Sequence, residues 1–200
     1  MTSRLPLGLY AIADAGFGDP LALGHALIDE GLQVVQLRCK GWSTADRIAV
    51  GRPLAARMHA NGGLLIMNDD LQAAVACRAQ GVHFGQSDGD PAAARAALPP
   101  GAVVGWSTHT IEHIEAVHPT VDYIGFGPLF GTSTKSTPYS PRHSLLSAAL
   151  HAAGSRPLVG IGGLTPSALP GLRAIGLRHW AAISALYTAP TLRLGVAALR

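Results

Sequence analysis

Short apolar runs alternate along the chain with longer segments in which apolar residues recur every three or four positions. Short apolar runs are typical of buried strands, whereas the longer spacing is typical of amphipathic helices. The expected strands are Gly8–Ala13, Val34–Lys40, Leu64–Asp69, Gly81–Gly85, Val103–His109, Tyr123–Gly127, Leu158–Gly163 and Trp180–Ser184. The expected helices are Pro20–Gly31, Thr44–Ala60, Leu71–Ala79, Pro91–Leu98, Ile111–Val117, Ser144–Ala153, Pro166–Ile175 and Ala189–Leu199.

Eight strand-and-helix units therefore share 200 residues, or about 25 residues each. This number and length of units is typical of a small (β/α)₈ barrel, the TIM barrel. The competing α/β fold is an open doubly wound sheet, which usually carries a glycine fingerprint after its first strand. No G-x-G-x-x-G occurs in Asp14–Asp19, which follows the first strand here. The pattern favours the barrel, and no linker interrupts it, so we expect one compact domain over residues 1–200.

Composition supports this fold class and narrows the possible partners. Hydrophobic residues make up 48% of the chain and charged residues 14%, which excludes a disordered protein. No apolar run approaches the roughly 18 residues that cross a bilayer, so we expect no membrane partner. The formal net charge of +3 is small and scattered, which argues against binding nucleic acid. The first residues do not form a secretory signal, so we expect a cytoplasmic location.

Polar residues interrupt the second expected strand where an apolar interior would be expected. Strand alternation places Gln36, Arg38 and Lys40 on one face, and the apolar residues between them, including Cys39, on the other. Burying two cations in a barrel without a negative partner would cost several kcal/mol. We therefore expect either an anionic ligand or an internal salt bridge to an acidic residue of a neighbouring strand.

Carboxylates follow the third and fourth expected strands. Asp69 and Asp88 would meet at the carboxyl rim of a barrel, beside Asn68, and two such carboxylates repel unless a cation lies between them. Hard oxygen ligands of this kind suit Mg²⁺, which completes its shell with water and substrate phosphates. The alternative is helix capping, for which Asp70 and Asp90 are the better candidates.

Hydroxyl groups and a lysine cluster near the ends of the fifth and sixth expected strands. Ser107 lies near the end of the fifth, and Thr132, Thr134 and Lys135 lie in a short loop after the sixth. Hydroxyls, backbone N–H groups and a cation together can cradle a phosphate or diphosphate. An ordinary solvated loop is the alternative reading of residues 132–135.

The seventh and eighth expected strands end in small residues that are suited to a second anion. Gly162 and Gly163 leave backbone N–H groups accessible, and Ile183 and Ser184 precede a possible helix start. This is the usual phosphate position of TIM barrels, although the glycines can instead serve the packing of strand against helix. The residues therefore predict two anion sites and one divalent cation, as an enzyme joining a diphosphate to a monophosphate would need.

Eight segments in order, from about Leu9 to Ala189, carry a family resemblance. They are Gln36–Lys40 (QLRCK), Asn68–Asp70 (NDD), Gly81–Asp88 (GVHFGQSD), Gly105–His109 (GWSTH), Asp122–Pro128 (DYIGFGP), Thr132–Lys135 (TSTK), Ile161–Gly163 (IGG) and Ile183–Ala185 (ISA). This series resembles the thiamine-phosphate synthase family. The resemblance implies a Mg²⁺-dependent transferase that joins 4-amino-2-methyl-5-hydroxymethylpyrimidine diphosphate to 4-methyl-5-(2-phosphoethyl)thiazole, releasing pyrophosphate and forming thiamine phosphate.

The resemblance also implies roles for individual residues. The implied catalytic residues are Lys135, Ser107 and Arg38, and the implied Mg²⁺ ligands are Asp69 and Asp88. The implied substrate-binding residues are Gln36, Arg38, Lys40, Asn68, Ser107, Thr132, Thr134, Lys135, Gly162, Gly163, Ile183 and Ser184. The partners implied are the two small-molecule substrates, with a homo-oligomer as a further possibility.

Three alternatives remain at this stage. The related thiazole tautomerases use a histidine after the glycine where this chain has Gly127-Pro128, which argues against that activity. A catalytically silent barrel that binds thiamine intermediates is compatible with residues 136–143, STPYSPRH, which depart from the family's usual glycine-containing loop. Other phosphate-binding barrels lack this order of motifs.

Overall fold

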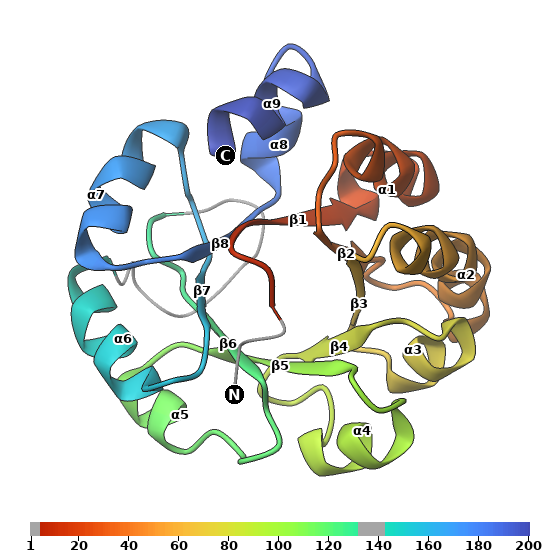
Figure 1. The fold of residues 1–200 in the computed structure, drawn as a ribbon, viewed down its shortest axis with the longest axis horizontal. Helices are drawn as coiled ribbons and strands as arrows, with labels where there is room; N and C mark the ends of the chain where they lie inside the picture. Colours follow the sequence, from red (N-terminus) through yellow and green to blue (C-terminus); the bar gives the residue numbers. More distant parts are fainter. Residues whose placement is uncertain (1–4, 132–142) are drawn as a thin grey trace.

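The eight strands close into a barrel in a computed structural model that describes residues 5–131 and 143–200. The strands are β1 Gly8–Asp14, β2 Val34–Arg38, β3 Leu64–Asn68, β4 Gly81–Phe84, β5 Val103–Thr108, β6 Tyr123–Phe126, β7 Leu158–Gly160 and β8 His179–Ala182. All neighbours are parallel, and β1 also pairs with β8, which closes the sheet (Figure 1). The predicted TIM barrel is therefore confirmed, and the open sheet is excluded.

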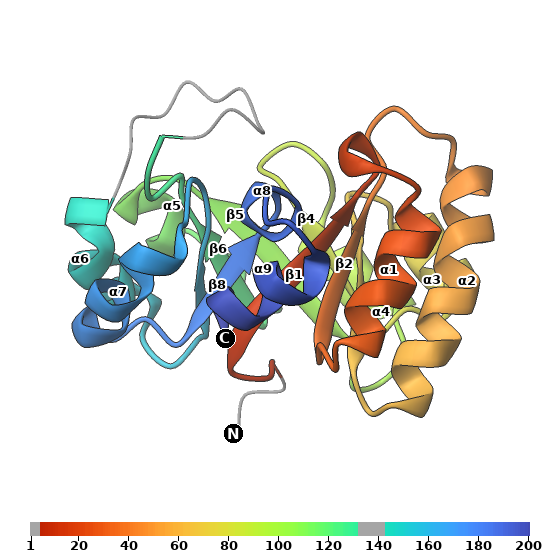
Figure 2. The same cartoon turned by 90° about the horizontal axis from the view of Figure 1, so that it is seen from above.

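Helices surround the barrel on its outer side (Figures 1 and 2). They are α1 Pro20–Asp29, α2 Thr44–Ala60, α3 Leu71–Cys77, α4 Pro91–Ala97, α5 Ile111–Glu115, α6 Leu146–Ala153, α7 Leu169–Ile175, α8 Ser184–Tyr187 and α9 Leu192–Leu199. Short 3-10 turns, η1 Ala15–Phe17, η2 His143–Leu145 and η3 Pro166–Ala168, follow β1 and precede α6 and α7. Within the described ranges, no helix combines the length and apolar character needed to cross a membrane.

The predicted boundaries are least accurate at the carboxyl ends of the strands. From β2 onwards each expected strand continues past the observed end, by three residues at β7. The chain leaves the ladder at residues with a left-handed backbone, Asp69 with φ 59° and Gly162 with φ 97°. The sequence indicated a possible helix start after Ile183 and Ser184, but the bounds of α8 were not predicted, because four residues are too few to show a helical period. The polar strand ends therefore belong largely to the loops that form the rim.

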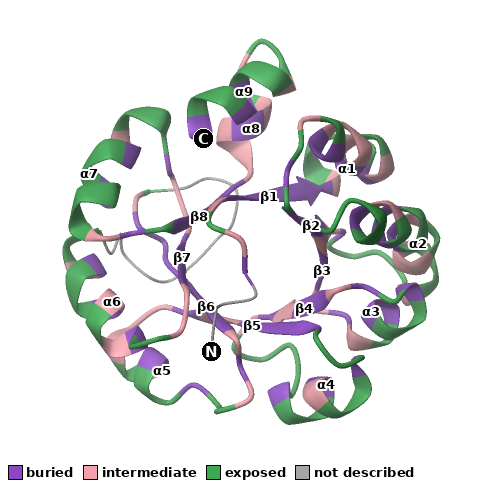
Figure 3. Ribbon diagram, viewed as in Figure 1, coloured by how far each residue is buried: buried purple, intermediate pink, exposed green. Residues whose placement is uncertain are grey.

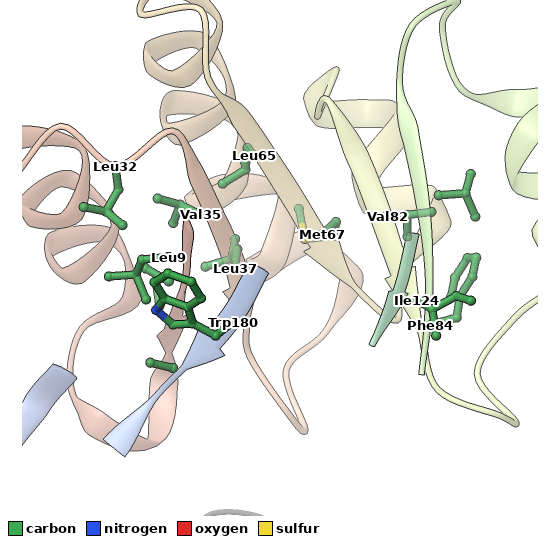
Figure 4. Close-up of a cluster of buried hydrophobic side chains, with 14 of the residues drawn as sticks. Leu9, Leu32, Val35, Leu37, Leu65, Met67, Val82, Phe84, Ile124 and Trp180 are labelled. Carbon is green, nitrogen blue, oxygen red and sulfur yellow. The ribbon is translucent and has the colours of Figure 1, made fainter. Parts of the chain in front are cut away.

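Two hydrophobic layers hold the barrel together. The layer between strands and helices includes Leu9, Val35, Leu37, Leu65, Met67, Val82, Phe84, Ile124 and Trp180 (Figure 4). Cys39 is buried in this outer layer, as alternation along β2 predicts. A smaller layer fills the barrel interior and consists of Leu5, Tyr10, Ile12, Val34, Ile66, Val103, Tyr123, Val159 and Ala181. The strands are accordingly buried on both faces, while the helices expose their outer surfaces (Figure 3).

Side-chain caps fix where several helices begin at the rim. Asp19, Ser43, Asp70 and Asp90 each accept a backbone N–H from the first turn of the helix that follows. Asp70 also accepts hydrogen bonds from Arg47 at 2.8 Å and from Thr44 Oγ1 at 2.9 Å. The expectation that Asp70 and Asp90 cap helices is confirmed, and Asp70 in addition ties α2 to α3.

We expect Asp70→Ala to destabilise the fold by about 2 kcal/mol at pH 7, because the cap and the Arg47 partner are both lost. Burial alone would raise the pKa of Asp70, but the hydrogen bonds from Ala73, Arg47 and Thr44 outweigh it and lower the pKa below its usual value. A lowered pKa means that the stabilisation is complete above about pH 4 and is lost as the pH falls further. Urea unfolding at pH 7 and at about pH 3 measures both effects.

Asp90→Ala is the matched control, because Asp90 is an exposed cap at the α4 start and forms no ion pair with any residue that the structure describes. A loss of unfolding free energy no larger for Asp70→Ala than for Asp90→Ala would contradict the role assigned to the Arg47 pair.

Candidate active site

A cavity of about 140 Å³ occupies the carboxyl-terminal half of the barrel interior. Its lining includes residues from all parts of the rim that the structure describes: Tyr10, Ile12, Gln36, Arg38, Asn68, His83, Ser107, Thr108, His109, Tyr123, Gly125, Gly127, Pro128, Val159, Ile161, Gly162, Gly163, Leu164, Ala181, Ala182, Ile183, Ser184 and Ala185. Active sites of TIM barrels lie at this end. The cavity is therefore the candidate active site.

The cavity brings together most of the predicted substrate-binding residues. Gln36, Arg38, Asn68, Ser107, Gly162, Gly163, Ile183 and Ser184 all line it. Thr132, Thr134, Lys135 and the departing segment 136–142 lie outside the described residues. Lys40 does not line the cavity, and its expected interior position is wrong. Strand β2 ends at Arg38, and a turn with Trp42 N–H donating to Cys39 O carries Lys40 to the surface.

Arg38 is paired inside the barrel with Asp14, the last residue of β1. The two residues are register partners on neighbouring strands, and both side chains are largely buried. The second carboxylate oxygen of Asp14 accepts the Gly16 N–H at 2.8 Å. The internal salt bridge considered from the sequence is thus present, while Arg38 still faces the cavity. Asp14 holds the guanidinium in place and balances its charge before a ligand binds.

Asp69 and Asp88 both lie close to Gly85. The Gly85 N–H donates to Asp69 Oδ1 at 3.3 Å, and a Cβ on Gly85 would overlap Asp88 Oδ2. Asn68 Nδ2 donates to the other Asp69 oxygen at 2.6 Å, and Asp88 is exposed. Among the described residues, no group of three or more His, Cys, Asp or Glu residues could hold a metal ion. The arrangement therefore offers two carboxylates, which suits a cation that takes its other ligands from water and substrate.

A chain of hydrogen bonds crosses the barrel interior from β2 to β5. Gln36 Nε2 donates to the Tyr10 hydroxyl at 2.8 Å, and the Tyr10 and Tyr123 hydroxyls lie 2.9 Å apart. Tyr123 lies 3.0 Å from His83 Nδ1, and His83 Nε2 lies 2.9 Å from Ser107 Oγ. Burial raises the pKa of both tyrosines above the usual value, so both phenols are neutral. The chain ends at Ser107, on the cavity wall.

The loops after β6 and β7 approach each other closely at the far side of the cavity. Gly162 and Gly163 have φ of 97° and 61°, a left-handed backbone that favours glycine. A Cβ on Gly162 would lie 2.7 Å from Pro128 Cα, and one on Gly163 would overlap Gly131 O. These contacts are with the loop after β6 and not with a helix, so the expected packing of strand against helix is not what the glycines provide. Both glycines also line the cavity, as does Ser184, where α8 begins.

Comparison with known proteins identifies the family. A model of the family described as thiamine monophosphate synthase matches residues 9–186. The chain belongs to this family. It is 39% identical over 184 residues to the thiamine biosynthesis bifunctional protein ThiED of Geobacter sulfurreducens, covering 92% of this chain and 37% of that protein. It is 33% identical over 193 residues to the thiamine-phosphate synthase of Laribacter hongkongensis, covering 94% of this chain and 92% of that protein.

Solved structures agree on the fold. The thiamine phosphate pyrophosphorylase from Pyrococcus furiosus superposes with a TM-score of 0.86 at 24% identity, covering all of this chain and 96% of that one. At this identity the similarity supports the barrel alone. The predicted membership of the thiamine monophosphate synthase family is confirmed by the family match and the relatives together. The chain spans less than half the length of the Geobacter sulfurreducens relative.

Sequence reasoning missed several residues of this site. Among them, Tyr10, Tyr123 and His83 line the cavity, and Asp14 lies behind its wall as the partner of Arg38. Asp14 could have been found, because it is an acidic residue directly after an apolar strand, next to the strand that carries Arg38. The two tyrosines look like ordinary strand residues, and only barrel closure brings them together.

We expect Asp14→Asn to lower the stability of this synthase-family barrel by about 3 kcal/mol, since Arg38 is left without a counter-charge while Asn still accepts the Gly16 N–H. Pyrophosphate would supply the missing negative charge, so it should raise the melting temperature of Asp14→Asn more than that of the unmodified protein. Thermal unfolding with and without the anion measures both. Asp29→Asn, which breaks the exposed Asp29–Arg57 pair, is the control. If pyrophosphate raised the melting temperature equally in the unmodified protein and in both variants, Arg38 would not face the anion.

Proposed function

We propose that this protein is a Mg²⁺-dependent thiamine-phosphate synthase. It would join 4-amino-2-methyl-5-hydroxymethylpyrimidine diphosphate to 4-methyl-5-(2-phosphoethyl)thiazole, giving thiamine phosphate and pyrophosphate. The observation that carries this proposal is one cavity lined at one side by Arg38, Asn68 and Ser107 and at the other by Gly162 and Gly163. Family membership supports the same reaction. The cytoplasmic location and a homo-oligomer stay predictions.

The chemistry requires charge stabilisation rather than a base. The bond from the pyrimidine methylene carbon to the diphosphate oxygen breaks, and its electron pair leaves with the diphosphate. The thiazole nitrogen then gives its lone pair to the same carbon, and no proton moves in this exchange. Arg38 and Ser107 face the cavity where negative charge would build on the leaving group, and their positions are fixed by Asp14 and His83.

Asp69 and Asp88 are the residues that would hold Mg²⁺. Both carboxylates lie close to Gly85, and the hard character of their oxygens fits an ion bound by one or two carboxylates. When bound, Mg²⁺ supplies positive charge against the diphosphate oxygens. Asn68 orients Asp69 through its amide and lines the cavity, so it connects the carboxylate to the substrate side. The diphosphate roles of Thr132, Thr134, Lys135 and Lys40 stay predictions.

The second phosphate would lie near Gly162, Gly163, Ile183 and Ser184. These residues line the same cavity, so a thiazole held there would face the pyrimidine methylene carbon across a short distance. Gln36 also lines the cavity, and we assign it to the pyrimidine. Pro128 is buried at the cavity wall, where a tautomerase would carry its histidine, and this favours the synthase reaction.

The direct test is incubation of the purified protein with both substrates and Mg²⁺. We expect thiamine phosphate and pyrophosphate to form in equal amounts. Absence of product with verified substrates would contradict the synthase proposal, and binding of thiazole phosphate without product would favour a silent binder. Isomerisation of the thiazole would favour a tautomerase.

We expect Asp69→Asn to reduce turnover by two or more orders of magnitude and to raise the Mg²⁺ concentration needed for half-maximal rate. Asparagine tolerates the left-handed backbone of Asp69, so the change removes a charge without adding backbone strain. The matched control is Asp90→Asn, because this exposed residue lies near the same rim and an Asn retains its cap. Unchanged turnover and Mg²⁺ dependence in Asp69→Asn would remove Asp69 from the ion site.

A further inference from the structure

We propose that Tyr10, Tyr123 and His83 are positioning residues that orient the Ser107 hydroxyl so that its proton points into the cavity as a hydrogen-bond donor. The acceptor is an anionic oxygen of the diphosphate, so this part of the proposal rests on the proposed function. The orientation itself is a property of the protein without substrate. It follows from which group donates and which accepts in each hydrogen bond of the series that ends at Ser107.

The direction of hydrogen-bond donation along this series is set by Gln36. The Gln36 amide nitrogen can only donate, so the Tyr10 oxygen accepts its hydrogen. The one proton of Tyr10 then goes to its neighbour in the chain, the Tyr123 oxygen at 2.9 Å. Tyr123 in turn gives its own proton to His83 Nδ1 at 3.0 Å. Each hydroxyl thus accepts one hydrogen bond and donates one.

The same direction continues through the imidazole ring. With Nδ1 accepting from Tyr123, neutral His83 carries its proton on Nε2 and donates it to Ser107 Oγ at 2.9 Å. Ser107 therefore accepts from the protein and keeps its own proton for a partner in the cavity. If Ser107 instead donated to His83, it would present only lone pairs to an anion, which would repel it.

Both tyrosine hydroxyls keep their protons at neutral pH. Tyr10 and Tyr123 are buried in the barrel interior, and desolvation is the main cause that raises the pKa of each phenol. Neither phenol is a tyrosinate at neutral pH, so each hydroxyl keeps a proton to donate, and the tilted ring pair at 5.9 Å holds the two hydroxyls together. The chain is therefore a static orienting device, and no proton needs to travel along it during the reaction.

Two glycines make room for this chain. Gly105 on β5 is the register partner of His83 on one side and of Tyr123 on the other. Because Gly105 has no side chain, its two neighbours meet across it, and a Cβ there would overlap the Tyr123 ring and His83 Nδ1. Gly125, the register partner of Ser107, leaves the next gap, where a Cβ would lie 3.2 Å from His83 Cε1. The backbone is therefore built around these contacts.

The first test reads the His83 tautomer in the substrate-free protein by ¹⁵N NMR, with His83→Gln used to assign the signals. We expect the proton on Nε2, with Nδ1 unprotonated. In Tyr123→Phe, Nδ1 loses its donor, so the fraction with the proton on Nδ1 should rise. A proton on Nδ1 in the unmodified protein would overturn the proposal, whether or not the protein proves to be a synthase.

The second test asks whether the tyrosine acts through Ser107. We expect Tyr123→Phe and Ser107→Ala each to weaken binding of pyrophosphate with Mg²⁺ about tenfold in calorimetry. In the double variant, Tyr123→Phe should add little to the loss of affinity caused by Ser107→Ala, because the tyrosine acts only through the Ser107 hydroxyl, which is already absent. Tyr187→Phe is the control, because the Tyr187 hydroxyl donates to Ile12 O and does not belong to the series of hydrogen bonds that ends at Ser107. We expect this variant to leave pyrophosphate binding unchanged.

The outcomes separate the two proposals. Additive losses in the double variant, or a loss in Tyr187→Phe as large as in Tyr123→Phe, would overturn the positioning role and indicate a general structural effect. If the unmodified protein binds no pyrophosphate, the proposed function fails, and the NMR result alone decides the orientation of Ser107.

Discussion

Closure of the sheet between β1 and β8 is the constraint from which the site follows. In a closed parallel barrel all carboxyl ends meet at one rim, and the inward side chains of all strands share one narrow interior. Residues as distant in sequence as Tyr10 and Tyr123 therefore touch, 113 positions apart. The interior is apolar at Val34 and Val103 and becomes polar towards the rim.

A narrow interior makes each polar group there costly unless it has a partner. Arg38 is balanced by Asp14, and the Gln36 amide begins a chain of hydrogen bonds that ends at Ser107. These partners serve stability and function together, because groups that are already held in place need little rearrangement when charge develops on a substrate. The same logic explains why the strands carry glycine where two interior side chains must meet, as at Gly105.

The barrel and much of the cavity wall could be predicted because strand alternation is a local rule. Alternation alone assigns Gln36 and Arg38 to the interior, and the rim position of Ser107 follows from where its strand ends. Features set by loop geometry or by contacts across the barrel could not be predicted. A turn after β2 removes Lys40 from the interior, and the tyrosine contact depends on the register of the closed sheet. Element boundaries at the rim were wrong for the same reason.

The central claim is that one cavity holds a diphosphate beside Arg38 and Ser107 and a second phosphate beside Gly162 and Gly163. A crystal structure of the protein with Mg²⁺, pyrophosphate and thiamine phosphate tests it most directly. We expect pyrophosphate within hydrogen-bond distance of Ser107 Oγ and the Arg38 guanidinium, and the phosphate of thiamine phosphate against the backbone of the two glycines. Both anions bound elsewhere, with the cavity filled only by water, would contradict the account.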